Sequence, residues 1–300
     1  MPGETYDSFC KGICQLLEDG QHYAINVYPC ELLPNSEMGQ AYYKEHFQIK
    51  STLVPFLLMH SKEDMNLSEA TEYAEYVTST YSMDENAWAE TMTFASFIQG
   101  LHNLGLTRAI AIYIRHVHNI SYHTFYKKLL AFAGDETLTV ISNVYKRIKS
   151  LCKGVSVGKN SFVAKSPGTG TMLWGFDELV FLEVYPELAL FYEQLYQWLA
   201  SWFSKDPVLK PLIEYQFDII KKVGHKEITI RSDYDFFRFF QTVLLADGNQ
   251  PVLERRQTTL LIHDPHPVDS FQTFAREIVW YGRNRRETDY TSSFYTVRIQ

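Results

Sequence analysis

The sequence predicts an α+β fold in which helices predominate. Across residues 84–152, and again across 177–222, apolar side chains recur at the spacing of amphipathic helices. Strands are predicted only where short stretches alternate between apolar and polar residues, at 23–33, 225–231, 257–263 and 291–299. Long helices with few short strands are typical of an α+β protein rather than of a large sheet.

The size, aromatic content and charge of the chain limit the number of domains and the class of ligand or partner. Its 300 residues exceed the usual size of one hydrophobic core, so we expect one large or two smaller domains. Aromatic residues make up 15%, which predicts a large aromatic core or an aromatic-lined pocket for a flat or apolar ligand. The net charge of −7 argues against a nucleic-acid partner, because phosphate binding requires a basic face.

The cysteines and hydropathy predict a cytoplasmic protein without a membrane partner. The chain has four scattered cysteines, and no secretory signal is recognised at its start. No apolar stretch reaches the roughly 18 residues expected of a membrane-spanning helix.

The first elements begin with a helix at 5–20. Thr5 or Ser8 can cap it, and Gly20 ends it. A strand follows at 23–33, then a short helix at 38–47 and an extended stretch at 51–59, where Pro55 argues against helix. Residues 69–80 are ambiguous, with a strand favoured for the β-branched residues 77–80.

A helix is predicted from Asp84 onward, with Ser82 or Asp84 as its N-terminal cap. Its apolar spacing is interrupted at Gly105. Further helices are predicted at 106–118, 121–133, 135–152, 177–204 with a kink at Pro186, 207–222, 233–245 and 268–280. Residues 153–171 are rich in glycine and predict a linker. The predicted organisation is therefore a first unit at 1–60, a helical region at 61–152, the linker at 153–171 and a C-terminal α+β domain at 172–300.

Two separate stretches carry a resemblance to a known family. The first contains the turn Pro2-Gly3-Glu4-Thr5, a helix, the strand from Tyr23 to Cys30, and Leu33-Pro34-Asn35-Ser36-Glu37-Met38. It resembles the last two strand–helix units of a radical SAM barrel. More narrowly, it is similar to the cobalamin-binding radical SAM group that includes anaerobic magnesium-protoporphyrin cyclase and several methyltransferases.

The second stretch lies near the end of the chain. Residues 233–236 (Asp-Tyr-Asp-Phe) and 274–283 resemble a C-terminal domain found behind the barrel in some of these proteins. The resemblance implies the C-terminal part of a B12-dependent radical SAM protein. Its fold would be a remnant of the last βα units of a TIM-type barrel, followed by a helical domain with a few strands.

The resemblance also implies a function and cofactors. The full-length enzyme would cleave S-adenosylmethionine reductively, with a [4Fe-4S] cluster and cobalamin, and modify or methylate an unactivated carbon of a small molecule. Gly3, Glu4 and Thr5 would lie near the adenine of S-adenosylmethionine. Tyr28, Pro29 and Cys30 would lie on the substrate side, at the barrel mouth. The same PGET turn also makes sense as a simple turn and helix cap.

The chain departs from the family in its cofactor ligands. Cluster binding needs three cysteines in a CxxxCxxC loop. Cys10 and Cys14 have the first spacing, but the third position is Leu17, and both cysteines fall on a predicted helix. We therefore expect ordinary thiols and an inactive isolated chain. The cluster and the cobalamin would come from a missing N-terminal half or a separate chain. The alternatives are a non-catalytic helical binding module derived from such an enzyme, and an unrelated helical protein that matches by chance.

Other constellations are weaker. His102, His116, His118 and His123 include no Glu-x-x-His pair, so solvated or core histidines are favoured over a metal site. Residues 154–161 are one residue short of a phosphate loop and predict a linker instead. A third set consists of arginines near Trp280 and Tyr281, for which a solvated basic face is favoured over a phosphate site: Arg255, Arg256, Arg276, Arg283, Arg285 and Arg286.

Overall fold

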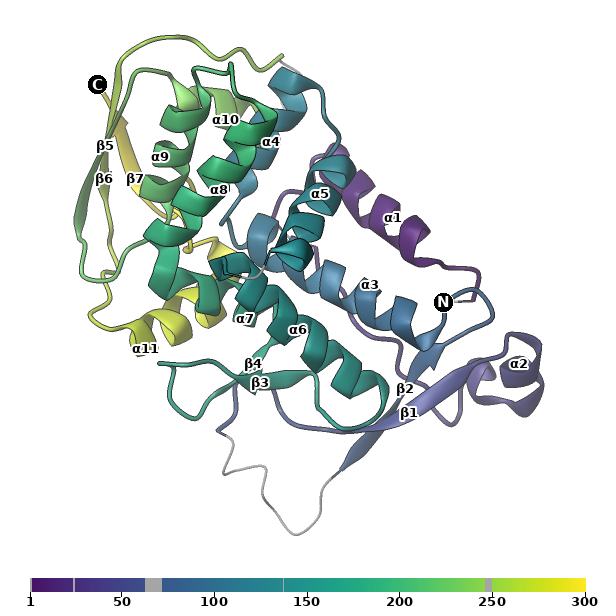
Figure 1. The fold of residues 1–300 in the computed structure, drawn as a ribbon. Helices are drawn as coiled ribbons and strands as arrows, with labels where there is room; N and C mark the ends of the chain where they lie inside the picture. The colour runs from purple at the N-terminus through teal and green to yellow at the C-terminus, as the bar shows by residue number, and fades with distance from the viewer. Residues whose placement is uncertain (1, 24, 63–71, 137, 246–249) are drawn as a thin grey trace.

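The computed structural model describes residues 2–23, 25–62, 72–136, 138–245 and 250–300. Helices dominate and the sheets are small, which confirms the predicted α+β class (Figure 1). The α-helices are α1 (Tyr6–Glu18), α2 (Ala41–His46), α3 (Glu85–Phe97), α4 (Arg108–His118), α5 (Tyr122–Asp135), α6 (Val140–Ser156), α7 (Phe176–Val184), α8 (Leu188–Trp202), α9 (Leu209–Ile219), α10 (Phe236–Leu245) and α11 (Phe271–Phe274).

The strands form small antiparallel sheets. β1 (Lys50–Pro55) pairs with β2 (Tyr73–Ser79), and β3 (Val163–Lys165) pairs with β4 (Leu173–Gly175). The third sheet has the order β5 (Glu227–Ser232), β6 (Thr258–His263) and β7 (Thr296–Ile299). Every strand pair in the described part of the chain is antiparallel, so the barrel remnant, whose strands would be parallel, stays a prediction.

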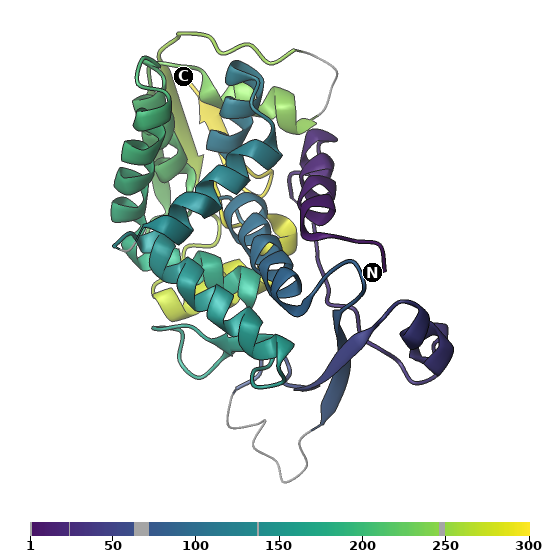
Figure 2. The same ribbon diagram turned by 45° about the vertical axis from the view of Figure 1, so that its right-hand side comes forward.

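One hydrophobic core runs through the helical body. It joins Cys10 on α1 to Tyr295 beside β7, and α3 lies in its middle with α1, α6 and α7 packed around it (Figure 1). Figure 2 shows the β1–β2 sheet and α2 projecting from this body. A small second cluster of Leu32, Ile49 and Val77 holds that projection together.

Two helices continue into π-helical turns. α3 runs into η3 (Ile98–Asn103), and α11 runs into η5 (Ala275–Tyr281), which is followed by the short 3₁₀ turn η6 (Arg283–Arg285). π-turns insert an extra residue into a helix and often border functional sites. Gly100 in η3 lies against α7 so closely that an added Cβ would be 2.6 Å from the Val180 Cβ.

Most predicted elements are confirmed with shifted ends. Thr5 caps α1 and forms a capping box with Ser8, and Asp84 caps α3. The predicted kink at Pro186 is the 3₁₀ turn η4 (Tyr185–Glu187) between α7 and α8. The short turn η1 (Glu37–Gly39) and α2 occupy the predicted helix at 38–47. The ambiguous segment 69–80 contains strand β2, while its residues 69–71 lie outside the described part.

The predicted strand at 23–33 is wrong. In the described residues of this segment only Glu31 forms a bridge, to Tyr76, flanked by hydrogen bonds from Leu32 N–H to the Glu75 carbonyl (2.7 Å) and from Val77 N–H to the Cys30 carbonyl (2.9 Å). The sequence does alternate here, but among the described residues strand β2 meets only the end of the segment, after Pro29. An extended segment becomes a strand only where a partner satisfies its backbone groups.

The division into domains stays a prediction. Residues 153–171 contain the end of α6 and strand β3, and residues on both sides of them contribute to the same core. Among the described residues, no helix combines the length and the apolar character that crossing a membrane demands.

Candidate functional site

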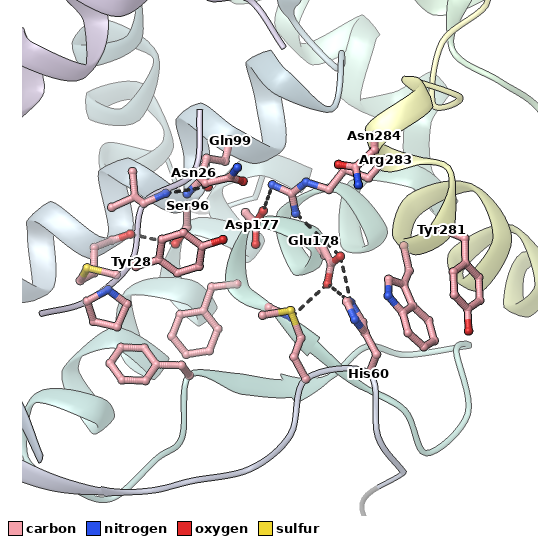
Figure 3. A pocket seen from close by; sticks show the side chains of 18 residues that line it. Asn26, Tyr28, His60, Ser96, Gln99, Asp177, Glu178, Tyr281, Arg283 and Asn284 are labelled. Carbon is pink, nitrogen blue, oxygen red and sulfur yellow. Dashed lines mark hydrogen bonds and ion pairs between the residues drawn. The ribbon is translucent and has the colours of Figure 1, made fainter. Parts of the chain in front are cut away.

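A pocket of about 440 Å³ opens where the first and last segments of the chain meet (Figure 3). Its wall combines aromatic and thioether side chains with a similar number of polar and charged ones. This size and lining are typical of small-molecule sites. The lining residues are Asn26, Val27, Tyr28, Pro29, Met59, His60, Met92, Ser96, Gln99, Phe162, Gly175, Phe176, Asp177, Glu178, Trp280, Tyr281, Arg283 and Asn284.

The π-turn η3 holds the front segment in the wall. The Gln99 Oε1 accepts a hydrogen bond from the Val27 N–H (3.3 Å), and its Nε2 donates to the Ala95 carbonyl (3.2 Å). Four residues on, the Asn103 Nδ2 donates to the Ile25 carbonyl (2.8 Å). Residues 25–29, which have no strand ladder of their own, are therefore fixed by side chains of a buried helix.

His60 is held from several sides. Its Nε2 lies 2.8 and 3.0 Å from the two carboxylate oxygens of Glu178, and its ring stacks on Trp280 at 4.2 Å between centroids. The backbone of His60 is left-handed, with φ of 64°, and its N–H donates to the Leu173 carbonyl (2.7 Å). A non-glycine residue in this conformation is uncommon and is found where the surroundings fix it.

Glu178 is the buried acceptor at the centre of the site. It is the third residue of α7, and its Oε2 accepts from the Gly175 N–H (3.2 Å), as a glutamate at this position of a helix start does. Its side chain is 1% exposed. Burial raises the pKa of Glu178, and the hydrogen bond from His60 opposes that shift.

Arg283 completes the charged part of the wall. Its guanidinium lies 2.6 Å from the Asp177 carboxylate and 3.8 Å from that of Glu178. Burial lowers the pKa of Arg283, but the attraction of Asp177 and Glu178 outweighs it and leaves the pKa raised. The two carboxylates thus face Arg283 and His60, and the cationic group of the wall is already paired.

The structure brings together some of the predicted site residues. Tyr28 and Pro29 line the pocket, and the Tyr28 side chain is 80% exposed. Cys30 does not line it. Its Sγ lies 3.7 Å from the Met38 Sδ, and it packs on the small cluster around Leu32 instead.

Gly3, Glu4 and Thr5 form the start of α1, away from the pocket lining. Gly3 has φ of 89° and donates its N–H to the Ser82 Oγ (3.0 Å), while the Ser82 Oγ donates to the Glu4 carbonyl (2.9 Å). Thr5 accepts from the Ser8 N–H (3.1 Å), and the Glu4 carboxylate accepts from the Ser8 hydroxyl. The turn needs a glycine at position 3 because of its positive φ.

Sequence reasoning missed His60, Asp177 and Glu178. The Gly175-Phe176-Asp177-Glu178 run before an apolar helix is a capping signature that would have located Glu178. His60 follows Leu-Leu-Met, and nothing in that run indicates a site. Arg283 was noted only within a larger group of arginines.

The other predicted constellations do not assemble into sites. His102 is fully buried, His118 bonds the Asp206 carboxylate (2.7 Å), and His123 lies on α5 near Asp7. Within the described ranges, no group of three or more His, Cys, Asp or Glu side chains is placed to hold a metal ion. Gly154, in the phosphate-loop-like run, is still part of α6.

The cysteines of α1 do not fit an iron–sulfur cluster. Cys10 and Cys14 lie on one face of the helix and are 0% and 1% exposed. Burial raises the pKa of Cys10 to about 12 and that of Cys14 further. Among the described residues, no third His, Cys, Asp or Glu side chain is grouped with them, whereas a cluster needs several ligands.

Most of the arginines near the end of the chain have local partners. Arg256 pairs with Asp235, Arg276 with Glu277 and Arg285 with Glu287, while the Arg286 guanidinium lies 4.1 Å from the Tyr23 ring centroid. This supports the predicted solvated basic face for Arg256, Arg276 and Arg285, which are about half exposed. Arg283 lies in the pocket wall instead.

Comparison with known proteins identifies two relatives. The cobalamin-dependent radical SAM methyltransferase TokK of Streptomyces tokunonensis is 28% identical over 236 residues, which cover 73% of this chain and 34% of TokK. The 2-(S-pantetheinyl)-carbapenam-3-carboxylate methyltransferase of Streptantibioticus cattleyicolor is 26% identical over 250 residues, covering 78% of this chain and 35% of that protein. No protein-family model matches the chain.

The chain thus spans about a third of the length of the relatives it matches. The predicted resemblance to cobalamin-binding radical SAM proteins is confirmed by both.

Proposed function

We propose that this chain is the substrate-facing, C-terminal portion of a cobalamin-dependent radical SAM methyltransferase. The observation that carries the proposal is the composition of the pocket. Tyr28 and Pro29 come from the front stretch of family resemblance, and Trp280 and Arg283 come from the back stretch, yet all four line one cavity. Segments that are far apart in the sequence and share a family resemblance are expected to meet where the family binds its ligand.

In the whole enzyme, S-adenosylmethionine, the [4Fe-4S] cluster and cobalamin would supply the radical and the methyl group. This chain would bind and orient the acceptor carbon. The aromatic wall of Phe162, Phe176 and Trp280 would exclude water from the reacting centre, and the polar groups would fix the orientation of the substrate.

The cofactors would be held mostly by another part of the enzyme, because the cysteines of this chain do not fit a cluster. We propose that Gly3, Glu4 and Thr5 form the chain's own contribution to the S-adenosylmethionine site. The left-handed Gly3 supports this proposal, because a glycine without Cβ lets a ligand approach the backbone closely.

The partner would be the cluster-bearing barrel half, on the same chain or on a separate one. Among the residues that the structure describes, half of the exposed large apolar side chains lie between residues 28 and 81, in and around the projecting β1–β2 sheet. They are Tyr28, Leu33, Tyr42, Leu53, Phe56, Leu58, Met59, Tyr73 and Tyr81. Exposed apolar side chains in such numbers mark a protein interface. The remnant-barrel interpretation of residues 1–60 belongs to this proposal.

A small-molecule substrate is the natural first candidate. One relative is named for a carbapenam that bears a carboxylate and a pantetheinyl arm. The pocket of about 440 Å³ has room for part of such a molecule. The four free cysteines support the further proposal of a cytoplasmic location.

The second candidate is a non-catalytic binding module derived from such an enzyme. The continuous core from Cys10 to Tyr295 favours it, because a body that buries its own core can fold without a partner. It predicts a stable monomer that binds a ligand in the same pocket and never turns it over.

The test begins with the DNA that precedes Met1 in frame and with the neighbouring genes. We expect a coding sequence for a CxxxCxxC loop. Co-expressed with it anaerobically, the chain should restore release of 5′-deoxyadenosine from S-adenosylmethionine, while the chain alone releases none. An in-frame stop codon with no cluster-binding gene nearby would refute the enzyme and leave the binding module.

A further inference from the structure

We infer that His60 is the residue of the pocket that recognises the ligand, through a hydrogen bond from an O–H or N–H group in an uncharged part of a small molecule to its Nδ1. The inference rests on the proposed function, because it takes the pocket to be the substrate site. Beyond that function, it names the recognition group and the chemical class of the ligand.

The contacts of Glu178 decide which ring nitrogen of His60 carries the hydrogen. The Gly175 N–H donates to this carboxylate at 3.2 Å, and the Arg283 guanidinium lies 3.8 Å from it. Glu178 is therefore an acceptor, and the His60 Nε2 at 2.8 and 3.0 Å from its oxygens is a donor. In a neutral imidazole whose Nε2 is protonated, Nδ1 is left as an acceptor.

The ring is fixed in place for this role. Trp280 stacks on one face at 4.2 Å with the planes 22° apart, and Trp174 lies edge-on at 5.5 Å. The left-handed backbone of His60 adds to the constraint, since few residues tolerate φ of 64°. A preorganised acceptor loses little freedom when a ligand binds.

Nδ1 is the nitrogen of His60 that is left for a ligand. Nε2 contacts Glu178, and His60 lines the cavity with 13% of its side chain exposed. The ring of His60 contacts Glu178 from α7 and the indoles of Trp174 and Trp280 from β4 and η5. Asp177 and Arg283 line the same cavity.

The ligand that fits is uncharged where it meets this wall. Arg283 is already paired with Asp177 at 2.6 Å, so it does not offer a free charge to a carboxylate or phosphate. The remaining polar side chains of the wall are those of Asn26, Tyr28, Ser96, Gln99, Tyr281 and Asn284. Ser96 and Gln99 already bond the backbone. Desolvating a ligand's charge without a partner would be costly, whereas hydroxyl and amide groups find partners here.

The experiment uses pantetheine as the probe, because it is uncharged and carries both hydroxyl and amide N–H groups. Binding to the full chain is measured by calorimetry at millimolar probe, with His60→Gln and His60→Asn as a matched pair. Glutamine keeps an amide near the Nε2 position and removes the Nδ1 acceptor, and asparagine keeps one near Nδ1 and tolerates a positive φ. His118→Gln is the control, because His118 contacts Asp206 and does not line the pocket.

We expect His60→Gln to weaken binding about tenfold, consistent with the loss of one hydrogen bond. His60→Asn should stay within about threefold of the wild type, and His118→Gln should bind unchanged. Long-range ¹H–¹⁵N spectra of the free protein should show the hydrogen of His60 on Nε2. Melting temperatures show whether each variant is folded.

Three results would overturn the inference. If Trp280→Leu abolishes binding but His60→Gln binds as the wild type does, the pocket stands and the role of His60 is wrong. If the spectra place the hydrogen on Nδ1, the acceptor role is wrong whatever the affinity. If wild type fails to bind, or binds regardless of Trp280→Leu, the pocket itself is wrong and the proposed substrate site falls with it.

Discussion

His22 and His102 show what burial does to single residues of this chain. The His22 Nδ1 lies 3.0 Å from the His102 Nε2, and the His102 Nδ1 lies 2.7 Å from the Tyr126 hydroxyl. Both rings are buried, at 3% and 0% exposure. Burial, with repulsion from Arg108 and His116, lowers the pKa of His22 to about 4, and burial lowers that of His102 as well. The fold therefore requires neutral rings.

The pH dependence of stability follows from His22. In the unfolded chain His22 has its ordinary pKa of 6.5, and in the folded chain about 4. Its contribution to stability is therefore complete above pH 6.5 and is lost as the pH falls towards 4. Between pH 7 and pH 5 this group alone should cost about 2 kcal/mol of the free energy of unfolding.

Urea denaturation at several pH values checks this expectation, with His22→Gln as the test and His118→Gln as the control. Below pH 6.5 the free energy of unfolding of His22→Gln should fall less steeply with pH than that of the wild type. The difference in slope should correspond to the uptake of about one proton fewer on unfolding. An unchanged slope would show that His22 is not the group that titrates.

At this scale the sequence located only part of the pocket. Tyr28 and Pro29 were predicted on the substrate side and line the pocket, whereas Cys30, the next residue, turns away to Met38. His60 was missed because its partner Glu178 is 118 residues away and the two meet only through the packing of α7 against the β3–β4 hairpin region. A contact between residues this far apart produces no local motif that the sequence alone could reveal.

At the scale of elements, the π-turn η3 depends on a glycine. An added Cβ at Gly100 would lie 2.6 Å from the Val180 Cβ and 2.7 Å from the Asp177 carbonyl oxygen. Both atoms belong to α7, which carries Asp177 and Glu178 into the pocket. The close packing of η3 on α7 is thus what places the carboxylates of the site.

Gly100→Ala should destabilise the chain by about 1–3 kcal/mol, because the overpacked helices must separate. Gly12→Ala is its control, since Gly12 is exposed on α1 and has nothing within 4 Å of an added Cβ. That change should stabilise the protein by about 0.5–1 kcal/mol. Chemical denaturation measures both, and equal effects at the two sites would refute the packing argument.

Elements were predictable where the signal was local. The Thr5 cap of α1, the Asp84 cap of α3 and the 3₁₀ turn at Pro186 follow from neighbouring residues. The strand at 23–33 was wrong because a strand needs a partner that the local pattern does not contain. Neither π-turn was predicted, since a single inserted residue leaves the helical periodicity around it intact.

At the scale of the whole molecule, two features oppose each other. The body has one continuous core, while the projecting β1–β2 region exposes apolar side chains such as Leu53 at 61% and Tyr42 at 61%. The core predicts a chain that folds, and the exposed side chains predict one that associates.

We therefore expect the isolated chain to self-associate at micromolar concentration, and Leu53→Glu to shift it towards monomer. Leu190→Glu, on α8, is the control, because Leu190 is also exposed, at 43%, but lies outside this region. Sedimentation velocity distinguishes the species. A wild-type monomer, or an equal effect of both variants, would contradict the interface.

The π-turn η3 has a consequence for the history of this gene. A π-turn holds one residue more than an α-helical turn, so the residues beyond it are rotated relative to a plain helix. A homologue that lacks one residue between Phe97 and Asn103 would keep the helix but would turn Asn103, which now bonds the Ile25 carbonyl, to another face. In an alignment of homologues, a one-residue gap at this point would therefore mark the proteins that lack this pocket wall.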